Sequence, residues 1–321
     1  MKLLLCPDTH LRETNPENRI DDYFTTQSKK EDFIIETAKK NECQAILKPG
    51  DIFDSFKASD FLLAHYIEKY RYAIQQPGHG LEGLHMIVIH GQHDLKFHSK
   101  DYTNIPLAVL DAARVIEIAG NEKIIVGDGH DFCCIYGASW GEEIPIPEPL
   151  SRGEKGINIL MVHAMIGNEK IWEGQKDFIY ASDFLRKHKE YDLIVSGDNH
   201  KTFYCKEGNR FLFNMGSLMR STIDQTNHKP MVALFDTQSL TYELIQIPIE
   251  PAETVFNLEK VEQQKEKSKE IEAFVEGLKS TEIVGLDFLS NLQTYLDDNK
   301  IEDKLQIRPI ISEVLNEGGQ V

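Results

Sequence analysis

Five short polar groups in this chain each come directly after an apolar run. The groups are Asp8 with His10, Asp51, Gln92 with His93, His163, and Asp198 with His200. Taken singly, an aspartate after a strand usually caps a turn, and a lone histidine is usually a hydrogen-bonded structural residue. Capping does not require imidazole, however, whereas a divalent metal does use neutral imidazole together with carboxylate. Five such groups in equivalent positions therefore favour a metal site.

The apolar runs before these groups are typical of buried β-strands. They are Lys2–Cys6, Ala45–Leu47, Met86–Ile89, Ile157–Val162 and Tyr191–Val195. Helical spacing lies between the first three, at Glu31–Asn41 and Ser59–Gln75. A strand, helix, strand order predicts parallel pairing through right-handed crossovers, which brings the carboxyl ends of the strands to one edge. We expect the polar groups to meet at that edge, where α/β enzymes keep their sites.

The middle of the chain has a different pattern of strands and turns. Short strands at close spacing, separated by glycine-containing turns, predict antiparallel pairing among Ala113–Ile118, Lys123–Val126 and Phe132–Ala138. Hairpin-like segments follow at Phe203–Lys206, Arg210–Asn214, Met231–Phe235 and Tyr242–Ile247. The mixed order predicts an α/β sandwich of two mixed sheets packed face to face with helices outside. Residues 12–30 are polar and predict an excursion over the surface.

Composition narrows the class of protein. The apolar fraction of 41% supports a sizeable core, and no apolar run approaches the roughly 18 residues that span a membrane. The first residues predict a strand and no signal peptide. Five scattered cysteines without a CxxC pair indicate reduced thiols and a cytoplasmic location. A net charge of −17 argues against coating nucleic acid by electrostatics alone, but not against meeting DNA through metals and a few basic side chains.

Two regions are expected along the chain. Residues 1–250 hold the strands and the polar groups, and residues 251–321 read as helical linker and C-terminal helices. The second region begins as a charged helix and ends in two apolar clusters, Val284–Leu296 and Ile301–Leu315, interrupted by Pro309. Such helices suit docking of a partner, and a tail folded back on the core is an equal alternative.

The joint pattern resembles the calcineurin-like metallophosphoesterase superfamily over about residues 1–247. The motifs of that superfamily are D-x-H, G-D-x-x-D, G-N-H-D, a histidine after an apolar strand, and G-H-x-H. In this sequence they appear as Asp8-Thr9-His10, Gly50-Asp51-Ile52-Phe53-Asp54, Gly91-Gln92-His93-Asp94, His163 and Gly197-Asp198-Asn199-His200. The chain is most similar to SbcD-type DNA repair exonuclease subunits and their phage counterparts. Three features point there: GDIFD before a long helix, GQHD before a short loop and an aliphatic segment, and Asn214–Arg220, close to that family's N-P-G-S segment.

The resemblance implies two metals bridged by Asp51. Asp8, His10 and His200 would complete the first site, and Gln92, His163 and Asp198 would complete the second. It also implies that His93 protonates the leaving oxygen, oriented by Asp54 or Asp94. This fits the chemistry, because two cations can hold a phosphodiester and activate water for in-line attack, while the leaving alkoxide needs a proton.

Two residues depart from the superfamily pattern, and both fall on the second metal. Gln92 stands where the family has asparagine, and Asp198 stands where it has histidine. Gln92 keeps the amide oxygen on a longer arm, while Asp198 adds a third carboxylate. Oxygen-rich ligation suits Mn²⁺ or Mg²⁺ better than Zn²⁺. We therefore expect a manganese-dependent enzyme whose second site is weaker.

Basic loop residues near the motifs are candidates for binding substrate phosphates. They are Arg12, Lys96, His98 and Arg220, and a solvated face is the equal alternative for each. The aromatic stripe of residues 61–73 would suit the homodimer contact of the resembled family, although packing on the domain's own sheet explains it as well.

The interpretation that unites these features is a two-metal DNA exo/endonuclease. It would act in repair or recombination in a bacterial or phage-infected cell, with an SbcC-type ATPase docked on the C-terminal helices. Two alternatives remain open at this point. One is an enzyme of the same fold acting on phosphoproteins or small phosphodiesters. The other is a non-catalytic subunit that keeps one structural metal because Gln92 and Asp198 have spoiled the second site.

Overall fold

The computed structural model describes residues 1–75, 83–128, 131–150, 156–170, 175–222, 225–258 and 269. The chain divides into two units, Met1–Val261 and Glu262–Val321. The helices expected in residues 259–321 lie outside the described residues, except for Lys269. Among the described residues, no helix has the length and apolar character needed to cross a bilayer.

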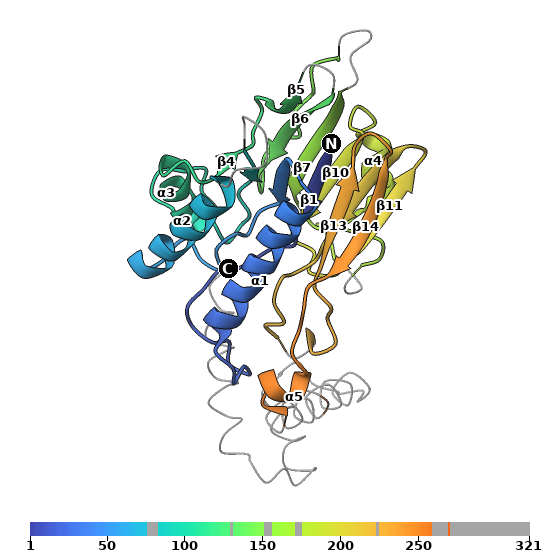
Figure 1. The fold of residues 1–321 in the computed structure, drawn as a ribbon. Helices are drawn as coiled ribbons and strands as arrows, with labels where there is room; N and C mark the ends of the chain where they lie inside the picture. The colour runs from blue at the N-terminus through green and yellow to red at the C-terminus, as the bar shows by residue number, and fades with distance from the viewer. Residues whose placement is uncertain are drawn as a thin grey trace, which may run out of the picture. The chain divides into compact units, whose positions relative to one another are not determined.

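Two six-stranded mixed sheets carry the described part of the first unit (Figure 1). The first sheet contains β1 (Lys2–Leu5), β2 (Ala45–Lys48), β3 (His85–Val88), β4 (Glu117–Ile118), β13 (Met231–Asp236) and β14 (Thr241–Gln246). The second contains β5 (Ile124–Asp128), β6 (Asp131–Ala138), β7 (Ile157–His163), β10 (Leu193–Gly197), β11 (Phe203–Glu207) and β12 (Arg210–Asn214). A small parallel pair, β8 (Ile166–Gly167) and β9 (Ile179–Tyr180), lies outside both.

Strand order explains where the polar groups meet. The orders are β14-β13-β1-β2-β3-β4 and β11-β12-β10-β7-β6-β5. Strands β1, β2, β3 and β4 run parallel, as do β12, β10, β7 and β6. Each parallel set sends its carboxyl ends to one edge of its sheet. The loops that follow β1, β2, β3 and β10 carry four of the polar groups, and His163 is the last residue of β7.

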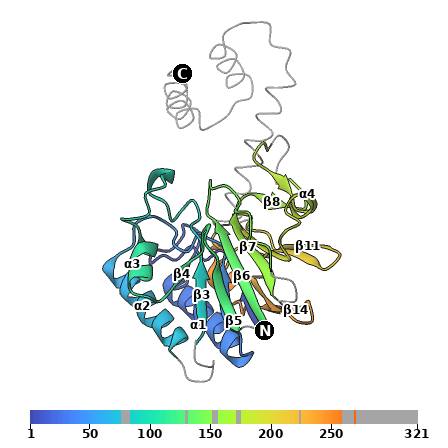
Figure 2. The ribbon, with the colours of Figure 1, turned by 90° about the horizontal axis from the view of Figure 1, so that it is seen from above.

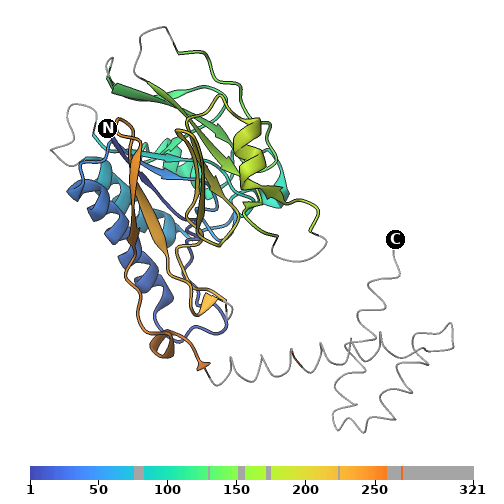
Figure 3. The same cartoon turned by 90° about the vertical axis from the view of Figure 1, so that its right-hand side faces the viewer.

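The helices cover the outer faces of the two sheets (Figures 2 and 3). These helices are α1 (Tyr23–Lys40), α2 (Asp60–Ile74) and α3 (Pro106–Ala112) on the first sheet and α4 (Ala181–Lys187) on the second. Helix α5 (Ala252–Val255) and the 3₁₀ turn η1 (Lys96–His98) lie in connecting segments. Side chains of β1 show the layering, because Leu4 packs towards the helices while Leu3 and Leu5 pack between the sheets. A third apolar cluster joins the second sheet to α4. The expected two-sheet sandwich with outer helices is confirmed.

Two expected elements differ in the structure. Helix α1 begins at Tyr23, eight residues before the expected start, with the Asp22 side chain accepting from Thr25 N. Its first turns bury Gln27 and Lys30, so the face turned to the core is partly polar and the apolar periodicity is hidden. The predicted strand Ala113–Ile118 was also wrong. Only β4 is extended there, and it pairs parallel with β3 because it returns to the sheet after helix α3.

The first unit continues past residue 250. Helix α5 leads to Phe256, which pairs with Arg19 as an isolated bridge and is 1% exposed. Ile20 N donates to Val255 O, and Asn257 N donates to Asn18 O. The segment from 251 to 257 therefore packs on the loop before α1.

Candidate metal centre

Backbone hydrogen bonds tie the loops of the site to one another. Thr9 N and His10 N both donate to Asp51 O, at 3.2 and 2.9 Å, which joins the loops after β1 and β2. Asp8 N donates to Gly216 O at 2.9 Å, and Leu218 N donates to Asp8 O at 2.8 Å. The position of Asp8 is thus fixed from both sheets before any side chain contributes.

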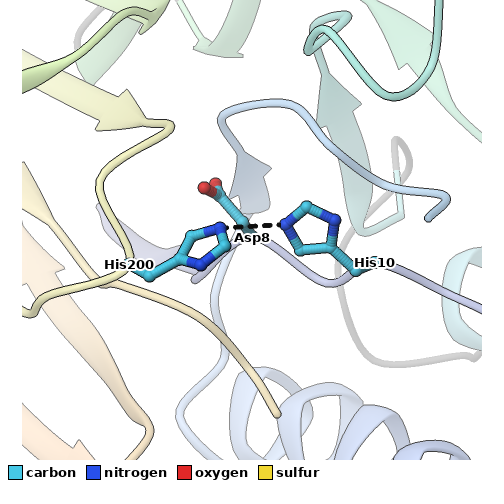
Figure 4. A group of neighbouring side chains, drawn as sticks. All are labelled: Asp8, His10 and His200. Carbon is cyan, nitrogen blue, oxygen red and sulfur yellow. Dashed lines mark hydrogen bonds between the residues drawn. The ribbon is translucent and has the colours of Figure 1, made fainter. Parts of the chain in front are cut away.

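Asp8, His10 and His200 form the first group of ligands (Figure 4). One ligand atom of each lies within 4.8 Å of the others. The His10 and His200 rings face each other through their Nε2 atoms at 3.1 Å, beside the Asp8 carboxylate. Two imidazoles and a carboxylate at this spacing match the ligands expected for the first metal.

Asp51 lies between this group and the second one. Its Oδ2 is 3.7 Å from His10 Nε2 and 3.4 Å from His163 Nε2. Its Oδ1 accepts from His93 N at 2.9 Å. The carboxylate therefore has one oxygen held by the backbone and one directed at imidazoles of both groups, as a bridging ligand requires.

Gln92, His163 and Asp198 are the ligands expected for the second metal. Gln92 Nε2 donates to Asp198 Oδ1 at 2.9 Å, so the two departures from the resembled family contact each other directly. His163 Nδ1 donates to Pro49 O at 2.7 Å. Since a carbonyl only accepts, Nδ1 carries a hydrogen, and the neutral ring presents its lone pair at Nε2.

Four buried polar atoms of these residues have no hydrogen-bond partner among the described residues. They are Asp8 Oδ1, Asp51 Oδ2, Gln92 Oε1 and His163 Nε2. Each unsatisfied buried acceptor costs about 1–3 kcal/mol. Two carboxylate oxygens, an amide oxygen and an imidazole nitrogen are donor atoms that Mn²⁺ or Mg²⁺ accepts. The residues therefore fit the two-metal centre that the sequence predicted.

The charges of the site point the same way. Burial raises the pKa of Asp8 well above its usual range. Burial alone would raise the pKa of Asp51. The nearby His163 imidazole has the larger effect and holds the pKa of Asp51 below its usual range. Burial lowers the pKa of the His163 ring, yet Asp51 and the other carboxylates raise it to about 10. These carboxylates therefore hold a proton on His163 in the absence of a cation, and a divalent cation at Nε2 would take the place of that proton and leave the ring neutral.

His10 differs from His163, because its imidazole is already neutral, as the imidazole of a metal ligand must be. Burial lowers the pKa of its imidazole to about 3, so the ring stays neutral at physiological pH. A neutral ring keeps a lone pair available for a cation.

Three residues of the centre have left-handed backbone conformations. They are His10 (φ 46°), Asp51 (φ 46°) and Asp198 (φ 86°). Such conformations cost about 1–3 kcal/mol each and persist only where the surrounding structure imposes them. Here the strain falls on three predicted ligands from three different loops.

Glycines make room for the ligands at two positions. A Cβ on Gly91 would lie 2.6 Å from Asp51 Cγ, and one on Gly197 would lie 2.6 Å from Asp8 Oδ1. Neither glycine has a positive φ. These positions therefore need glycine for space alone.

His93 is exposed at the edge of the centre, where a general acid must be. Its Nδ1 donates to the backbone carbonyl of Asp54 at 3.0 Å, and its ring lies 4.9 Å from that of His10. The carboxylate of Asp54 instead pairs with Arg12 at 2.9 Å. Asp54 thus orients His93 through its backbone, which is a correction to the expected side-chain role.

Asp94 does not orient His93. It is 1% exposed, and its carboxylate accepts from the backbone N–H groups of Ile52, Phe53 and Gly91. Asp94 therefore joins the loop after β2 to the loop after β3. Sequence alone could not reveal this, because two of the three N–H groups belong to a distant segment.

Two cavities meet at His93. The larger, of about 660 Å³, is lined by Arg12 and His200 and by polar residues of two loops, at positions 15, 17, 18, 217, 221, 222 and 225. The smaller, of about 460 Å³, is lined by Gln92 and His98 among others. His93 and Asp54 line both cavities.

The four residues predicted to bind substrate phosphates differ in their positions in the structure. Arg12 and His98 line the cavities, and Lys96 is exposed with its Nζ 5.9 Å from the centroid of the Phe97 ring. Arg220 is only 3% exposed, and it donates to the backbone carbonyls of Thr226 and Glu250. Arg220 is therefore a structural cation, and its predicted contact with substrate was wrong.

Gln27 is a supporting residue that the sequence interpretation missed. It is fully buried, donates to the carbonyls of Thr9 and His10 at 3.0 Å, and accepts from Arg12 N. It fixes the loop that carries the first ligands. No local signal could have identified it, because a glutamine in a polar segment resembles a surface residue.

Comparison with known proteins adds little to this picture. No family model and no curated protein matches the chain. Among solved structures, it is similar to an archaeal phosphodiesterase, with 13% identity and a TM-score of 0.39 over 77% of this chain and 99% of that one. It is also similar to a dimetal phosphatase from Danio rerio, with 10% identity and a TM-score of 0.44 over 78% and 99%. Likenesses of this size carry no argument about function. Any inference about the class of protein rests on the sandwich fold and on the candidate metal centre.

Proposed function

We propose that the protein is a metal-dependent phosphodiesterase of the calcineurin-like metallophosphoesterase superfamily. The observation that carries the proposal is the convergence of four unsatisfied buried ligand atoms beside an exposed histidine. Structural metal sites do not require an imidazole at the cavity mouth, so His93 favours a catalyst over a non-catalytic subunit.

The chain's own residues have distinct tasks in this proposal. Two divalent ions held by the two ligand groups would neutralise the phosphate and activate water for in-line attack. His93, with Nδ1 bonded to Asp54 O, has Nε2 available to donate a proton to the leaving oxygen. Arg12 lies at the wall of the larger cavity, where it can contact a phosphate oxygen.

The natural substrate we propose is DNA, cleaved as by SbcD-type subunits in repair or recombination in the cytoplasm. Because His93 and Asp54 line both cavities, a chain that continues on both sides of the scissile phosphate has room in each direction. A phosphomonoester would fill only one side. We also propose that an SbcC-type ATPase binds the C-terminal helices and that helix α2 contributes to a homodimer.

The test is a panel of substrates with Mn²⁺. Single- and double-stranded DNA are compared with an aryl phosphodiester and an aryl phosphomonoester. Cleavage of DNA at a much higher kcat/KM is the expected result. Preference for the monoester or for the small diester alone would assign the chain to the phosphatases or small-molecule phosphodiesterases of this fold.

Metal identity is tested separately by calorimetry. Titration with Mn²⁺ is expected to give two unequal affinities, because Gln92 and Asp198 occupy only the second group. One stoichiometric site, or tight zinc in both, would contradict a manganese enzyme.

A further inference from the structure

The smaller cavity beside His93 has an aromatic wall that the two-metal chemistry does not use. Its lining includes Phe56, Leu95, Phe97 and His98 together with His93 and Gln92. The side chain of Phe97 is 78% exposed, although the protein has large apolar clusters in which a phenylalanine could be buried. Phe97 lies with Phe56 and Leu95 in this lining, so its ring belongs to an apolar patch at the edge of the site, and such patches mark binding surfaces.

The backbone holds Phe97 outward at a cost. Phe97 and His98 both have left-handed conformations, with φ of 52° and 54°. Bulky residues avoid this region, which costs about 1–3 kcal/mol for each residue. His98 is seated against Trp140, with ring centroids 5.0 Å apart, and this anchors the turn η1.

Phe97 is supported from behind by Phe56, and two lysines lie near this pair of rings. Phe56 lies 5.4 Å from it between centroids, at an interplanar angle of 52°, so no ring fits between the two. The outward face of Phe97 is therefore the face that a ligand meets. Lys57 Nζ lies 5.5 Å from the Phe56 centroid, and Lys96 Nζ lies 5.9 Å from that of Phe97.

A flat π surface flanked by cations suits a nucleobase attached to phosphates. Stacking of a base on an aromatic side chain contributes about 1–3 kcal/mol and tolerates every base, because each has a π face. A protein partner would explain the exposed ring, but it would not explain why the same cavity includes His93 and Gln92.

We infer that Phe97 is a stacking platform for the nucleobase next to the scissile phosphate on the leaving-group side. The inference rests on the proposed function and names its substrate class as single-stranded or frayed nucleic acid. It places the base against Phe97 while His93 reaches the leaving oxygen. Lys57 and Lys96 lie where the next phosphates pass.

The first experiment measures binding before turnover. Short single-stranded oligonucleotides carry one 2-aminopurine, moved position by position, and are mixed with the Mn²⁺-loaded full chain in a stopped-flow fluorimeter. One position is expected to be quenched by stacking. Phe97→Ala is expected to abolish that quenching and weaken binding about tenfold, within the range of base–aromatic stacking. Phe97→Tyr keeps both.

A matched control separates this site from general loss of apolar surface. Ile125→Ala removes an apolar side chain of strand β5 that is 53% exposed and lines neither cavity, and it should bind like the parent. Equal binding by Phe97→Ala and the parent would overturn the inference. So would a change of oligomeric state in Phe97→Ala on gel filtration, which would make the ring a protein contact.

The second experiment separates the inference from the proposed function. Oligonucleotides with and without an abasic site at the quenched position are cleaved by the parent and by Phe97→Ala. Removing the base should raise KM about tenfold in the parent, and the difference should vanish in the variant. If the parent cleaves DNA but is indifferent to the abasic site, the inference alone fails. If the metal-loaded parent cleaves no phosphodiester, the proposed function fails.

Discussion

At the scale of single residues, Gln92 and Asp198 are the features that set this centre apart. Their side chains are hydrogen-bonded at 2.9 Å, and the amide oxygen of Gln92 is left buried without a partner among the described residues. Asp198 thus orients the amide so that its oxygen is free for a cation. The two departures from the resembled family are therefore explained together, because each side chain supplies the hydrogen-bond partner of the other.

This contact predicts coupling in a double-mutant cycle. Gln92→Asn alone and Asp198→His alone should each weaken Mn²⁺ binding at the second site about tenfold, because each breaks the contact. The double variant should recover part of the loss, with a coupling energy of about 0.5–3 kcal/mol measured by calorimetry. Additive effects would show that the pair is not compensated.

His93 is predicted to act in turnover and not in metal binding. Its side chain bonds only to a backbone carbonyl among the contacts described, and it is the backbone N–H that holds Asp51. His93→Ala should lower kcat about 10²–10⁴-fold and leave the metal content unchanged by elemental analysis. The control His85→Ala removes an imidazole at the start of β3 that is bonded to Glu117. Unchanged turnover in His93→Ala would favour the non-catalytic alternative.

At the scale of elements, the loops after β2 and β3 are packed so closely that one added carbon disturbs the site. Asp94 joins them from the side, and Gly91 lies against the Asp51 carboxylate. Below them, Lys48 of β2 donates to both oxygens of Glu31 in α1, at 2.8 and 2.7 Å, and all three groups of the Lys48, Glu31 and Tyr70 network are buried. The strand that delivers Asp51 is therefore anchored to helices α1 and α2.

Gly91→Ala should damage metal binding through sterics. The new Cβ would meet Asp51 Cγ at 2.6 Å, so the carboxylate or the loop must move. We expect a loss of about 1–3 kcal/mol in unfolding free energy and weaker Mn²⁺ binding. Gly120→Ala is the matched control, since its Cβ would meet nothing within 4 Å. Equal behaviour of the two variants would contradict the close packing.

The buried Lys48–Glu31 pair should be costly to break from one side. Lys48→Met leaves a buried carboxylate without its partner and should cost about 3–5 kcal/mol in urea unfolding. Adding Glu31→Leu should recover most of the loss, since two apolar side chains replace two charges. Arg186→Met removes an exposed pair with Asp183 and should cost under about 1 kcal/mol. No recovery in the double variant would assign the cost to packing.

At the scale of the whole molecule, the sandwich remains folded although the metal centre at one edge contains strained backbone and buried polar atoms without hydrogen-bond partners in the part of the chain that the structure describes. Three strained ligands, repelling carboxylates and four orphaned ligand atoms lie together in the centre. The large apolar clusters on both sides of the sheets sustain this cost.

Metal binding should therefore stabilise the entire unit. Mn²⁺ at 100 times its dissociation constant should raise the unfolding free energy by about 2.7 kcal/mol per site, and EDTA should remove the gain, as measured by thermal unfolding. Asp51→Asn should lose most of the effect, because Asp51 lies between both ligand groups. A melting temperature that ignores both Mn²⁺ and EDTA would argue against the centre.

The sequence determined most of the strands, the sandwich class and the candidate ligands, because each candidate ligand directly follows an apolar run and is therefore encoded locally. The start of α1, the place of β4, and the roles of Asp94, Arg220, Gln27 and Phe97 were decided by the tertiary structure alone. In each of these cases the partner or the exposure depends on a segment far along the chain. Local pattern shows which chemical groups arrive at an edge, whereas only packing decides which of them remain free to act.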